Sequence, residues 1–541
     1  MKRNSIKILL LTSVIAGTMM LSCKKNLILT PNDQVTAVQV YSTPAGYKQA
    51  LAKVYGSFAL TGNQGPAGPV GEGDIKGIDE GTSDFFRLYW YAQELPTDEA
   101  VVGWGDPGLP DFHNLSWSSS NLFLQGLYYR CTYQITLCNE FIRQSSDANL
   151  SSRGITGTDA TNIRYYQAEA RFLRAYQYSV LMDLFANPPF ATETTPLASV
   201  TPPQTDRKTL FTYIESELKA IDGNLVAPKK NEYGRADQAA DWALLARIYL
   251  NAQVYTGTAR YTDAITYAQK VINAGYSLTN KYDNLMLADN NLNTNEFILT
   301  INYDGNNTQS YGGTTFMTHA PVGGTMPSSS FGISGGWAGI RTTSNLVKLF
   351  PDNIATSFPN NGNPDKRAEF YTSGQNLIIN DVTSFTDGFA VTKFRNVTST
   401  GAAGSNISYS DVDMPIFRLP EMYFIYAESV LRGGTGGDAA TALTYMNKIR
   451  TRAYSGSTSG NIATTDLTTD FILNERAREL FWEGFRRTDL IRYGRFVEGT
   501  YLWPYKGGVK GGTSVASYRT IYPLPTSDLG VNSNLKQNTG Y

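Results

Sequence analysis

The stretch Trp242-Ala243-Leu244-Leu245-Ala246-Arg247-Ile248-Tyr249 decides the fold class of this 541-residue chain. Its tryptophan, leucine, small residue and tyrosine follow the spacing W-x2-L-small-x2-Y, which is typical of the first helix of a tetratricopeptide repeat, with alanine in place of glycine. Residues 236–255 are therefore predicted to be helical, with residues 261–274 as their partner helix. Ala264 and Ala268 in that partner are small enough to allow close contact between the two helices.

Helical periodicity extends on both sides of this repeat. Further helices are expected over residues 45–60, 122–145, 163–184, 210–221, 420–431 and 439–454. The last two form a second helix pair, because a glycine-rich turn joins them. We therefore expect a mostly α protein in which tetratricopeptide-type helical hairpins form a scaffold. An unspecialised helical bundle is the alternative.

The helical period fades between residues 305 and 413. Residues 311–340 contain three Gly-Gly pairs and Trp337. A long loop of this kind inside a compact body is usually either functional or disordered, and the regular occurrence of aromatic residues argues against disorder. A few short strands are expected nearby, at residues 297–303 and 389–394.

The composition narrows the possible functions. The chain carries 34 tyrosines, 25 phenylalanines and 49 glycines, and its formal net charge is −1. No basic stripe suggests nucleic-acid binding. The two histidines, His113 and His319, are too few for a zinc site or a Ser-His-Asp triad with convergent partners. Aromatic side chains on glycine-rich loops favour a flat ligand platform over acid–base catalysis.

The N-terminus predicts export and lipid anchoring. Residues 1–22 begin with a basic pair and continue with a short apolar run, which is typical of a secretory signal. Cys23 follows the small residue Ser22, so we expect cleavage at this point and acylation of the Cys23 thiol. An ordinary signal peptide with a chance cysteine is the alternative. Cys131 and Cys138 are expected to be buried thiols, because seven helical residues separate them beyond disulfide reach.

The C-terminal part contains the motifs that identify a family. They are PIFRLPEMY at 415–423, NERAREL at 474–480, WEGFRRTDLIR at 482–492, YPLP at 522–525 and QNTGY at 537–541. In these motifs the chain strongly resembles the SusD/RagB family, and the resemblance covers essentially the whole mature chain. The family consists of lipid-anchored glycan-binding proteins of Bacteroidetes outer membranes.

The resemblance implies a division of the chain within one compact body. The expected parts are a signal peptide at 1–22, an anchor and linker at 23–44, a tetratricopeptide-like helical part at 45–304 with an inserted ligand-binding loop at 84–117, a loop-rich ligand-binding region at 305–414 and a C-terminal helical part at 415–541.

Several segments are similar to the starch-binding member of the family in particular. They include residues 94–99, 234–237 and 501–518. Trp90 and Tyr91 lie in the same region as the first of these, and either core or site rim is compatible with their positions.

The same resemblance implies the site residues. The three aromatic side chains that cup a curved α-glucan fall on Trp104, Tyr311 and Trp337, and the arginine that binds sugar hydroxyls falls on Arg87. The family's asparagine has no clear equivalent. Asp106 is the nearest polar stand-in, and as a carboxylate it only accepts hydrogen bonds.

Some relatives also hold a calcium ion. Asp411 and Asp413, together with Asp289, could supply the hard oxygen ligands that calcium prefers. An Asp-x-Asp sequence before an apolar run is also a common turn signal, which is the alternative. No other cofactor is implied.

The helix expected around residue 479 presents a cluster of charges. Glu475, Glu479 and Glu483 recur at four-residue spacing, so they share one helix face. We interpret them as a structural salt network with Arg478, and with Arg486 and Arg487 nearby. The alternative is a catalytic carboxylate pair for glycoside hydrolysis.

The implied function is binding without catalysis. The protein would capture starch or malto-oligosaccharides at the cell surface and deliver them to a SusC-like TonB-dependent transporter, while anchored to the outer membrane and facing the exterior. A second hypothesis keeps the fold but changes the ligand to another glycan or a peptide. A third is a glycoside hydrolase.

Overall fold

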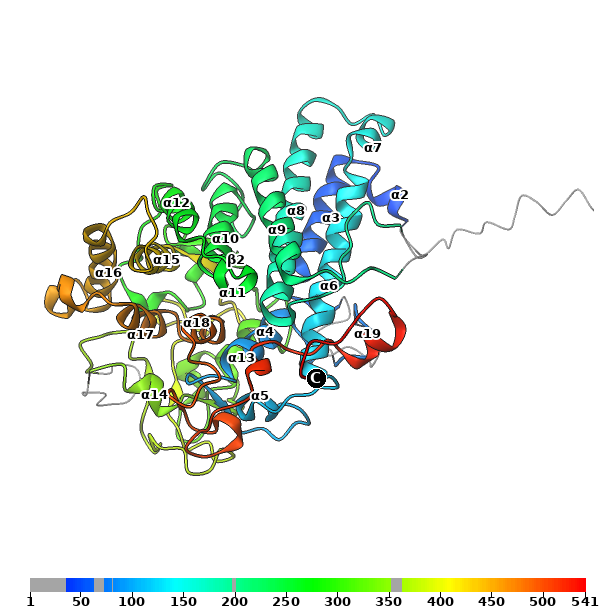
Figure 1. Ribbon diagram of the computed structural model, residues 1–541. Coiled ribbons are helices and arrows are strands. Elements are labelled where there is room, and N and C mark those ends of the chain that lie inside the picture. The colour runs from blue at the N-terminus through cyan, green and yellow to red at the C-terminus, as the bar shows by residue number, and fades with distance from the viewer. Residues whose placement is uncertain (1–35, 63–72, 80, 197–200, 352–361) are drawn as a thin grey trace, which may run out of the picture.

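The computed structural model describes residues 36–62, 73–79, 81–196, 201–351 and 362–541 (Figure 1).

A row of antiparallel helices forms one half of the molecule. Helix α10 (Gln238–Leu250) packs against α12 (Tyr261–Ile272), α12 packs against α15 (Leu419–Leu431), and α15 packs against α16 (Ala439–Ala453). The two predicted hairpins are therefore confirmed, and they stack on each other.

The tetratricopeptide pattern explains why α10 packs so closely. Its Leu245, Ala246 and Tyr249 are fully buried, while Trp242 lies half-buried and donates from Nε1 to Asp222 at 2.8 Å. The N-cap Asp237 accepts from the second and third N–H groups of the helix, which satisfies donors that would otherwise have no partner.

The N-terminal half is a second helical layer. Helix α8 (Gly157–Phe185) lies at its centre and packs against α3 (Pro44–Gly56), α6 (Leu122–Gln144) and α9 (Arg207–Ile221). The sequence predicted all four helices. The shorter helices are α2 (Ala37–Val40), α5 (Asp111–Asn114), α7 (Asp147–Ser152), α11 (Ala252–Thr256), α14 (Ser344–Val347), α17 (Thr469–Leu480), α18 (Arg486–Arg492) and α19 (Thr526–Val531).

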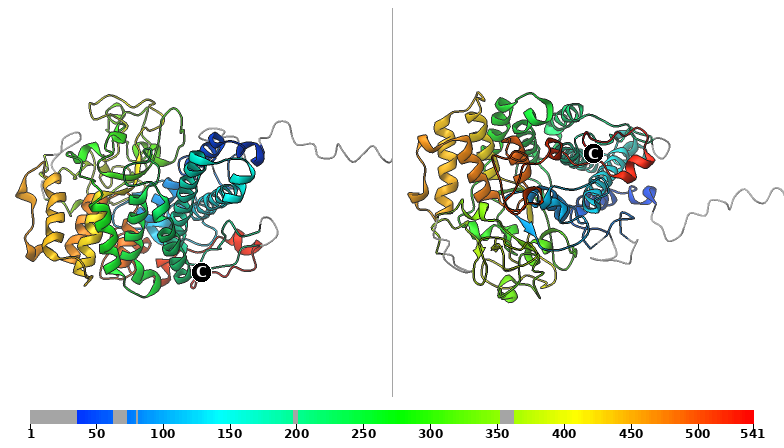
Figure 2. Two further views of the ribbon diagram at one scale, coloured as in Figure 1. Left: turned by 90° about the horizontal axis from the view of Figure 1, so that it is seen from above. Right: turned by 60° about the horizontal axis from the view of Figure 1, so that its bottom comes forward.

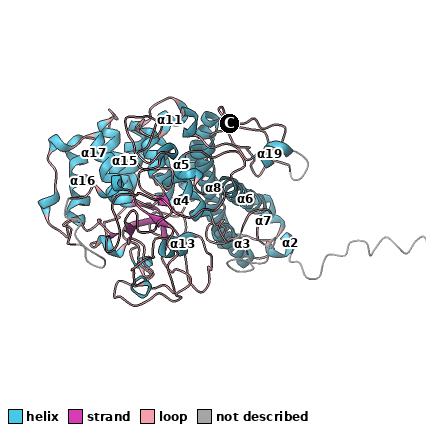
Figure 3. Ribbon diagram, turned by 90° about the horizontal axis from the view of Figure 1, so that it is seen from below, coloured by secondary structure: helices cyan, strands magenta, loops and turns pink. Residues whose placement is uncertain are grey.

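The described strands form three small antiparallel pairs. Strand β2 (Phe297–Ile301) pairs with β6 (Met414–Arg418), β1 (Val101–Val102) with β3 (Ile340–Arg341), and β4 (Phe370–Tyr371) with β5 (Ala390–Val391). These strands lie where the helical scaffold meets the loop-rich segment (Figure 3). That segment gathers on one side of the scaffold (Figure 2).

One hydrophobic cluster runs through both halves, from Tyr41 to Leu535. Cys131 and Cys138 lie inside it as unpaired, buried thiols, as the sequence predicts. Cys23 lies outside the described residues. Among the residues that are described, none of the helices has both the length and the apolar character needed to cross a membrane.

One prediction about local structure is wrong. The segment 84–117 was expected as a loop, but it begins with helix α4 (Phe85–Glu94), whose N-cap is Asp84. Almost the whole helix is buried, including Trp90 and Tyr91, so its aromatic residues belong to the core. Five of its ten residues are aromatic, a type that is more common in strands, so local propensity does not indicate a helix here.

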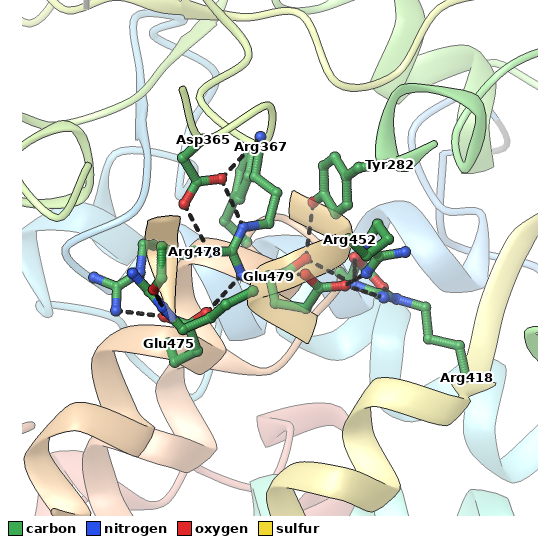
Figure 4. A network of polar contacts seen from close by, with 12 residues as sticks. Tyr282, Asp365, Arg367, Arg418, Arg452, Glu475, Arg478 and Glu479 are labelled. Atoms are coloured by element: carbon green, nitrogen blue, oxygen red, sulfur yellow. Dashed lines mark hydrogen bonds and ion pairs between the residues drawn. The ribbon is translucent and has the colours of Figure 1, made fainter. Parts of the chain in front are cut away.

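The charged face around residue 479 is a buried ion network (Figure 4). Glu479 is fully buried and binds Arg367 at 3.3 Å, Arg418 at 2.6 Å and Arg452. Glu475 binds Arg367, Arg450 and Arg478, while Glu483 binds Lys393 and Arg418. The predicted structural role is borne out by this geometry, because every carboxylate of the trio faces guanidinium or ammonium groups.

Two predicted members lie outside the network. Arg486 forms a bidentate pair with Asp98, both contacts being 2.7 Å, and Arg487 donates to the Thr520 carbonyl while lying over Tyr522. They follow the end of α17, so the helical spacing that places Arg478 beside Glu475 does not apply to them. Glu483 also lies beyond Leu480, so the prediction that it shares one helix face with Glu475 and Glu479 is wrong, although it joins the same ion network.

Candidate functional site

Asp84 joins the two segments that carry Arg87 and Tyr311. Its Oδ1 accepts from the Arg87 N–H at the start of α4, and also from the Gly313 N–H at 2.8 Å, at the start of α13 (Gly313–His319). A Cβ on Gly312 would lie 1.9 Å from the Asp84 Cβ, so only glycine permits this approach. The Gly-Gly pair after Tyr311 therefore has a structural reason.

Strand pairing brings Trp104 and Trp337 together although 233 residues separate them. The β1–β3 ladder continues beyond its last pair through a 2.8 Å bond from the Gly103 N–H to the Gly339 carbonyl. The Trp104 indole then donates from Nε1 to the Trp337 carbonyl at 3.2 Å. A Cβ on Gly339 would lie 2.1 Å from the Trp104 ring, so this glycine makes room for the indole.

His319 supports the Trp337 ring from behind. The two ring centroids are 5.0 Å apart with an interplanar angle of 31°, and the Trp337 N–H donates to the His319 carbonyl at 2.8 Å. His319 Nδ1 lies 2.9 Å from the Thr315 carbonyl on α13. Burial lowers the pKa of His319, so its ring is neutral at pH 7. His319 therefore has a packing role beside Trp337.

The three predicted aromatic residues meet at one place. The Trp104 and Trp337 centroids are 6.4 Å apart at 46°, and the Tyr311 and Trp337 centroids are 6.4 Å apart at 66°. Tyr311 is 37% exposed, while both indoles are half-buried against the core. Rings inclined at these angles form a curved surface rather than a flat one.

Arg87 lies beside these rings and is held from several sides. Its guanidinium carbon is 5.8 Å from the Trp104 centroid and 5.9 Å from that of Trp337. Nε donates to the Tyr91 hydroxyl at 2.8 Å, and Nη1 to the Tyr311 carbonyl at 2.9 Å. Within the described part of the chain, Nη2 makes no hydrogen bond.

Asp106 lies at the rim of the same cluster. Its side chain is exposed, in the turn that follows Trp104. The pKa of Tyr91 is raised, mainly by burial, with the Asp106 charge as a smaller contribution, and the Arg87 charge opposes both. The carboxylate therefore lies within electrostatic reach of the Arg87–Tyr91 pair and offers acceptors that face solvent.

Two further residues position the site: sequence reasoning left Tyr91 between core and site rim, and it missed Phe316. Tyr91 and Phe316 enclose the Arg87 guanidinium, with Phe316 only 4.8 Å from it. An aspartate N-cap at Asp84 followed by Arg87 and Tyr91 at i and i+4 was a detectable signal. The sequence contains no comparable signal for Phe316, because this residue lies far from Arg87 in the chain.

The three aspartates proposed for calcium do not converge. Asp289 accepts from the Ser399 backbone and hydroxyl, Asp411 from Gly305 and Ser405, and Asp413 from Tyr303 and Tyr233. Burial raises the pKa of Asp413 to about 7, which weakens it as an ionised ligand. Within the described ranges no group of three or more His, Cys, Asp or Glu side chains is placed to hold a metal. The calcium site remains a prediction without a ligand cluster.

Comparison with known proteins identifies the family to which this chain belongs. A sequence model of the SusD family matches residues 366–541. The chain is 35% identical over 583 aligned residues to the starch-binding protein SusD of Bacteroides thetaiotaomicron, and the alignment covers all of both chains. The protein therefore belongs to the SusD family.

Solved structures share the fold. Surface glycan-binding protein A from Bacteroides fluxus superposes with a TM-score of 0.68 at 20% identity, covering 92% of this chain and all of that one. A laminarin-binding SusD-like protein superposes with a TM-score of 0.67 at 21% identity, covering 92% of this chain and 99% of that one.

Proposed function

We propose that this protein binds an α-glucan of the starch type on the surface formed by Trp104, Tyr311 and Trp337. The observation that supports the proposal is the convergence of these three rings beside Arg87, although Trp104 lies more than 200 residues before the other two. The full-length similarity to a protein named for starch binding favours this glycan over others.

The chemistry of a pyranose suits this surface. One face of the sugar presents C–H groups, which an aromatic ring covers while its negative face attracts their slightly positive edge. Sugar hydroxyls at the rim then lose water and need new partners. Arg87 Nη2 donates to them, and Asp106 accepts from them. Because the inclined rings define a curve, a helical α-glucan fits better than a flat, extended polymer.

The proposed function is binding without hydrolysis. Glycoside hydrolysis requires two carboxyl groups flanking one glycosidic bond. The platform offers the exposed Asp106, whereas the buried Asp84 is engaged in holding backbone N–H groups. Incubation of the pure protein with starch should yield no new reducing ends. Turnover that a carboxylate substitution abolishes would contradict this proposal.

We further propose that acylated Cys23 anchors the protein to the outer membrane, facing the exterior, and that a SusC-like TonB-dependent transporter receives the glycan. The basic and apolar N-terminal sequence supports the anchor. Protease treatment of intact cells should cleave an exterior protein and spare an internal one. Co-purification of the transporter from solubilised membranes would test the partnership.

A native affinity gel tests the ligand. Migration of the protein should be retarded by amylopectin and unaffected by xylan, fructan or pectin, and Trp104→Ala should abolish the retardation. Retardation by a different glycan alone would favour the hypothesis that the same fold binds another glycan. A laminarin-binding SusD-like protein with a similar fold supports that alternative. Unchanged retardation after EDTA treatment is expected if the site needs no calcium.

A further inference from the structure

A fourth aromatic ring continues the row of the proposed glycan site. The Tyr409 ring centroid is 5.6 Å from that of Tyr311 at an interplanar angle of 41°. Among the described residues, Tyr409 has a ring contact with Tyr311, and Tyr311 has a second ring contact with Trp337. The ring contacts therefore run in the order Trp104, Trp337, Tyr311 and Tyr409.

The backbone next to Tyr409 is anchored to α13, the helix that begins two residues after Tyr311. The Ser410 N–H donates to Thr315 Oγ1 on α13 at 3.0 Å. The Tyr409 carbonyl packs on Gly305, where a Cβ would approach it to 2.6 Å. Tyr409 and Tyr311 therefore keep a fixed relation to each other, as a preformed surface requires.

A buried asparagine holds the rest of the loop. Asn396 is fully buried, donates from Nδ2 to the carbonyls of Gly332 and Asn406, and accepts the Asp411 N–H at 2.9 Å. Asp411 in turn accepts the Gly305 N–H at 2.7 Å. These bonds give Asn396 and Asp411 a defined role, which is to fix the loop that presents Tyr409.

The Tyr409 side chain is only partly covered. Burial, followed by a hydrogen bond and charge interaction with the Tyr311 hydroxyl, raises the pKa of Tyr409 to about 12. The ring therefore stays neutral and apolar at physiological pH. Beside it, Ile407 is 52% exposed and its carbonyl accepts from Ser334, close to Trp337 in the chain.

We propose that Tyr409 forms an additional sugar subsite beyond Tyr311, which makes the site prefer longer α-glucans. This inference rests on the proposed function. A short ligand that covers Trp104, Trp337 and Tyr311 does not reach Tyr409, whereas a longer one stacks a further glucose on it. The chain-length preference of the protein is thus assigned to one residue.

Isothermal titration with maltotriose and maltoheptaose tests the subsite. Tyr409→Ala should weaken maltoheptaose binding about five- to tenfold, since burial of one ring face is lost, and leave maltotriose binding within about twofold. Tyr409→Phe should bind both as the parent does. Tyr409→Leu keeps apolar volume without a flat face and should lose affinity as Tyr409→Ala does. Tyr165→Ala, at a 36% exposed tyrosine on α8, is the matched control.

Several outcomes would overturn the inference. Equal affinity of the parent and Tyr409→Ala for maltoheptaose would exclude a sugar subsite at Tyr409, while the proposed α-glucan binding would still hold. An equal loss for both ligands would show that Tyr409 acts through Tyr311 and not on a further sugar. If the parent binds neither ligand, the proposed function fails, and the subsite with it. Thermal unfolding of each variant checks that its fold is retained.

Discussion

Replacing Glu479 by glutamine should destabilise the whole protein. Glu479 is fully buried, and its two oxygens bind Arg367, Arg418 and Arg452. An amide at this place removes the negative charge and turns an N–H group toward guanidinium donors. Removing one partner of a buried ion network costs about 3–5 kcal/mol, because the remaining charges stay buried without compensation.

The pKa of Glu479 gives a second estimate of the free energy that this carboxylate contributes to folding. Although burial opposes ionisation, the charges of Arg452, Arg418 and Arg367 lower the pKa of Glu479 to about 2, from an ordinary value of about 4.5. A shift of this size corresponds to about 3 kcal/mol in favour of the ionised, folded form. Since the folded pKa is the lower one, the stabilisation is complete above about pH 4.5 and is lost as the pH falls toward 2.

Urea unfolding followed by far-ultraviolet circular dichroism measures this effect. At pH 7 the free energy of unfolding of Glu479→Gln should be about 3 kcal/mol below that of the parent, and the difference should shrink as the pH falls below 4.5. Glu140→Gln is the matched control, because Glu140 forms an exposed pair with Arg143 on α6 that is worth less than about 1 kcal/mol. A loss no larger than that of the control, or one independent of pH, would refute the reasoning.

Three further predictions concern the proposed site and the anchor. Gly339→Ala should lower α-glucan affinity about tenfold, because its Cβ would displace the Trp104 ring, whereas Gly335→Ala, where no atom lies within 4 Å, should bind as the parent does in titration calorimetry. Arg87→Lys should also weaken binding about tenfold, since the single nitrogen of an ammonium cannot take the separate positions of Nε at Tyr91, Nη1 at the Tyr311 carbonyl and Nη2 at a sugar hydroxyl; unchanged affinity would exclude a sugar contact by Arg87. Cys23→Ala should move the protein from the membrane to the soluble fraction of cell lysates, and continued membrane association would contradict acylation at this residue.

The helical scaffold was predictable because its signals are local. The spacing of Trp242, Leu245 and Tyr249 lies within one helix. Asp206, an aspartate directly before α9, accepts from the second and third N–H groups of that helix, which is the usual role of this residue type at an N-cap. Helix α4 was not predicted because it is short and half of its residues are aromatic, a type that is more common in strands than in helices.

The partners of the buried charges depend on contacts that no local pattern encodes. Glu475 could be paired with Arg478 from helical spacing, but Arg367 and Arg418 reach Glu479 from other parts of the chain. The β1–β3 pairing that joins the two tryptophans is equally long-range and covers only two residue pairs. Only the family resemblance could place Trp104 beside Trp337.

Tyr409 is a residue whose position could not be predicted from the sequence. It lies in a loop without periodicity, and its relation to Tyr311 depends on Asn396, Thr315 and Gly305. Each of these contacts is specific and none repeats, so neither composition nor spacing could have selected this tyrosine from the 34 in the chain.

The most direct test of the central claim is titration calorimetry of maltoheptaose with the parent and with Trp337→Ala, at one pH and ionic strength. Trp337 contacts both Trp104 and Tyr311, so its removal breaks the row of rings at its centre. Measurable binding by the parent and loss of at least about tenfold in the variant, with thermal unfolding unchanged, is the predicted result. Equal affinity of the two proteins would contradict a binding site formed by these rings.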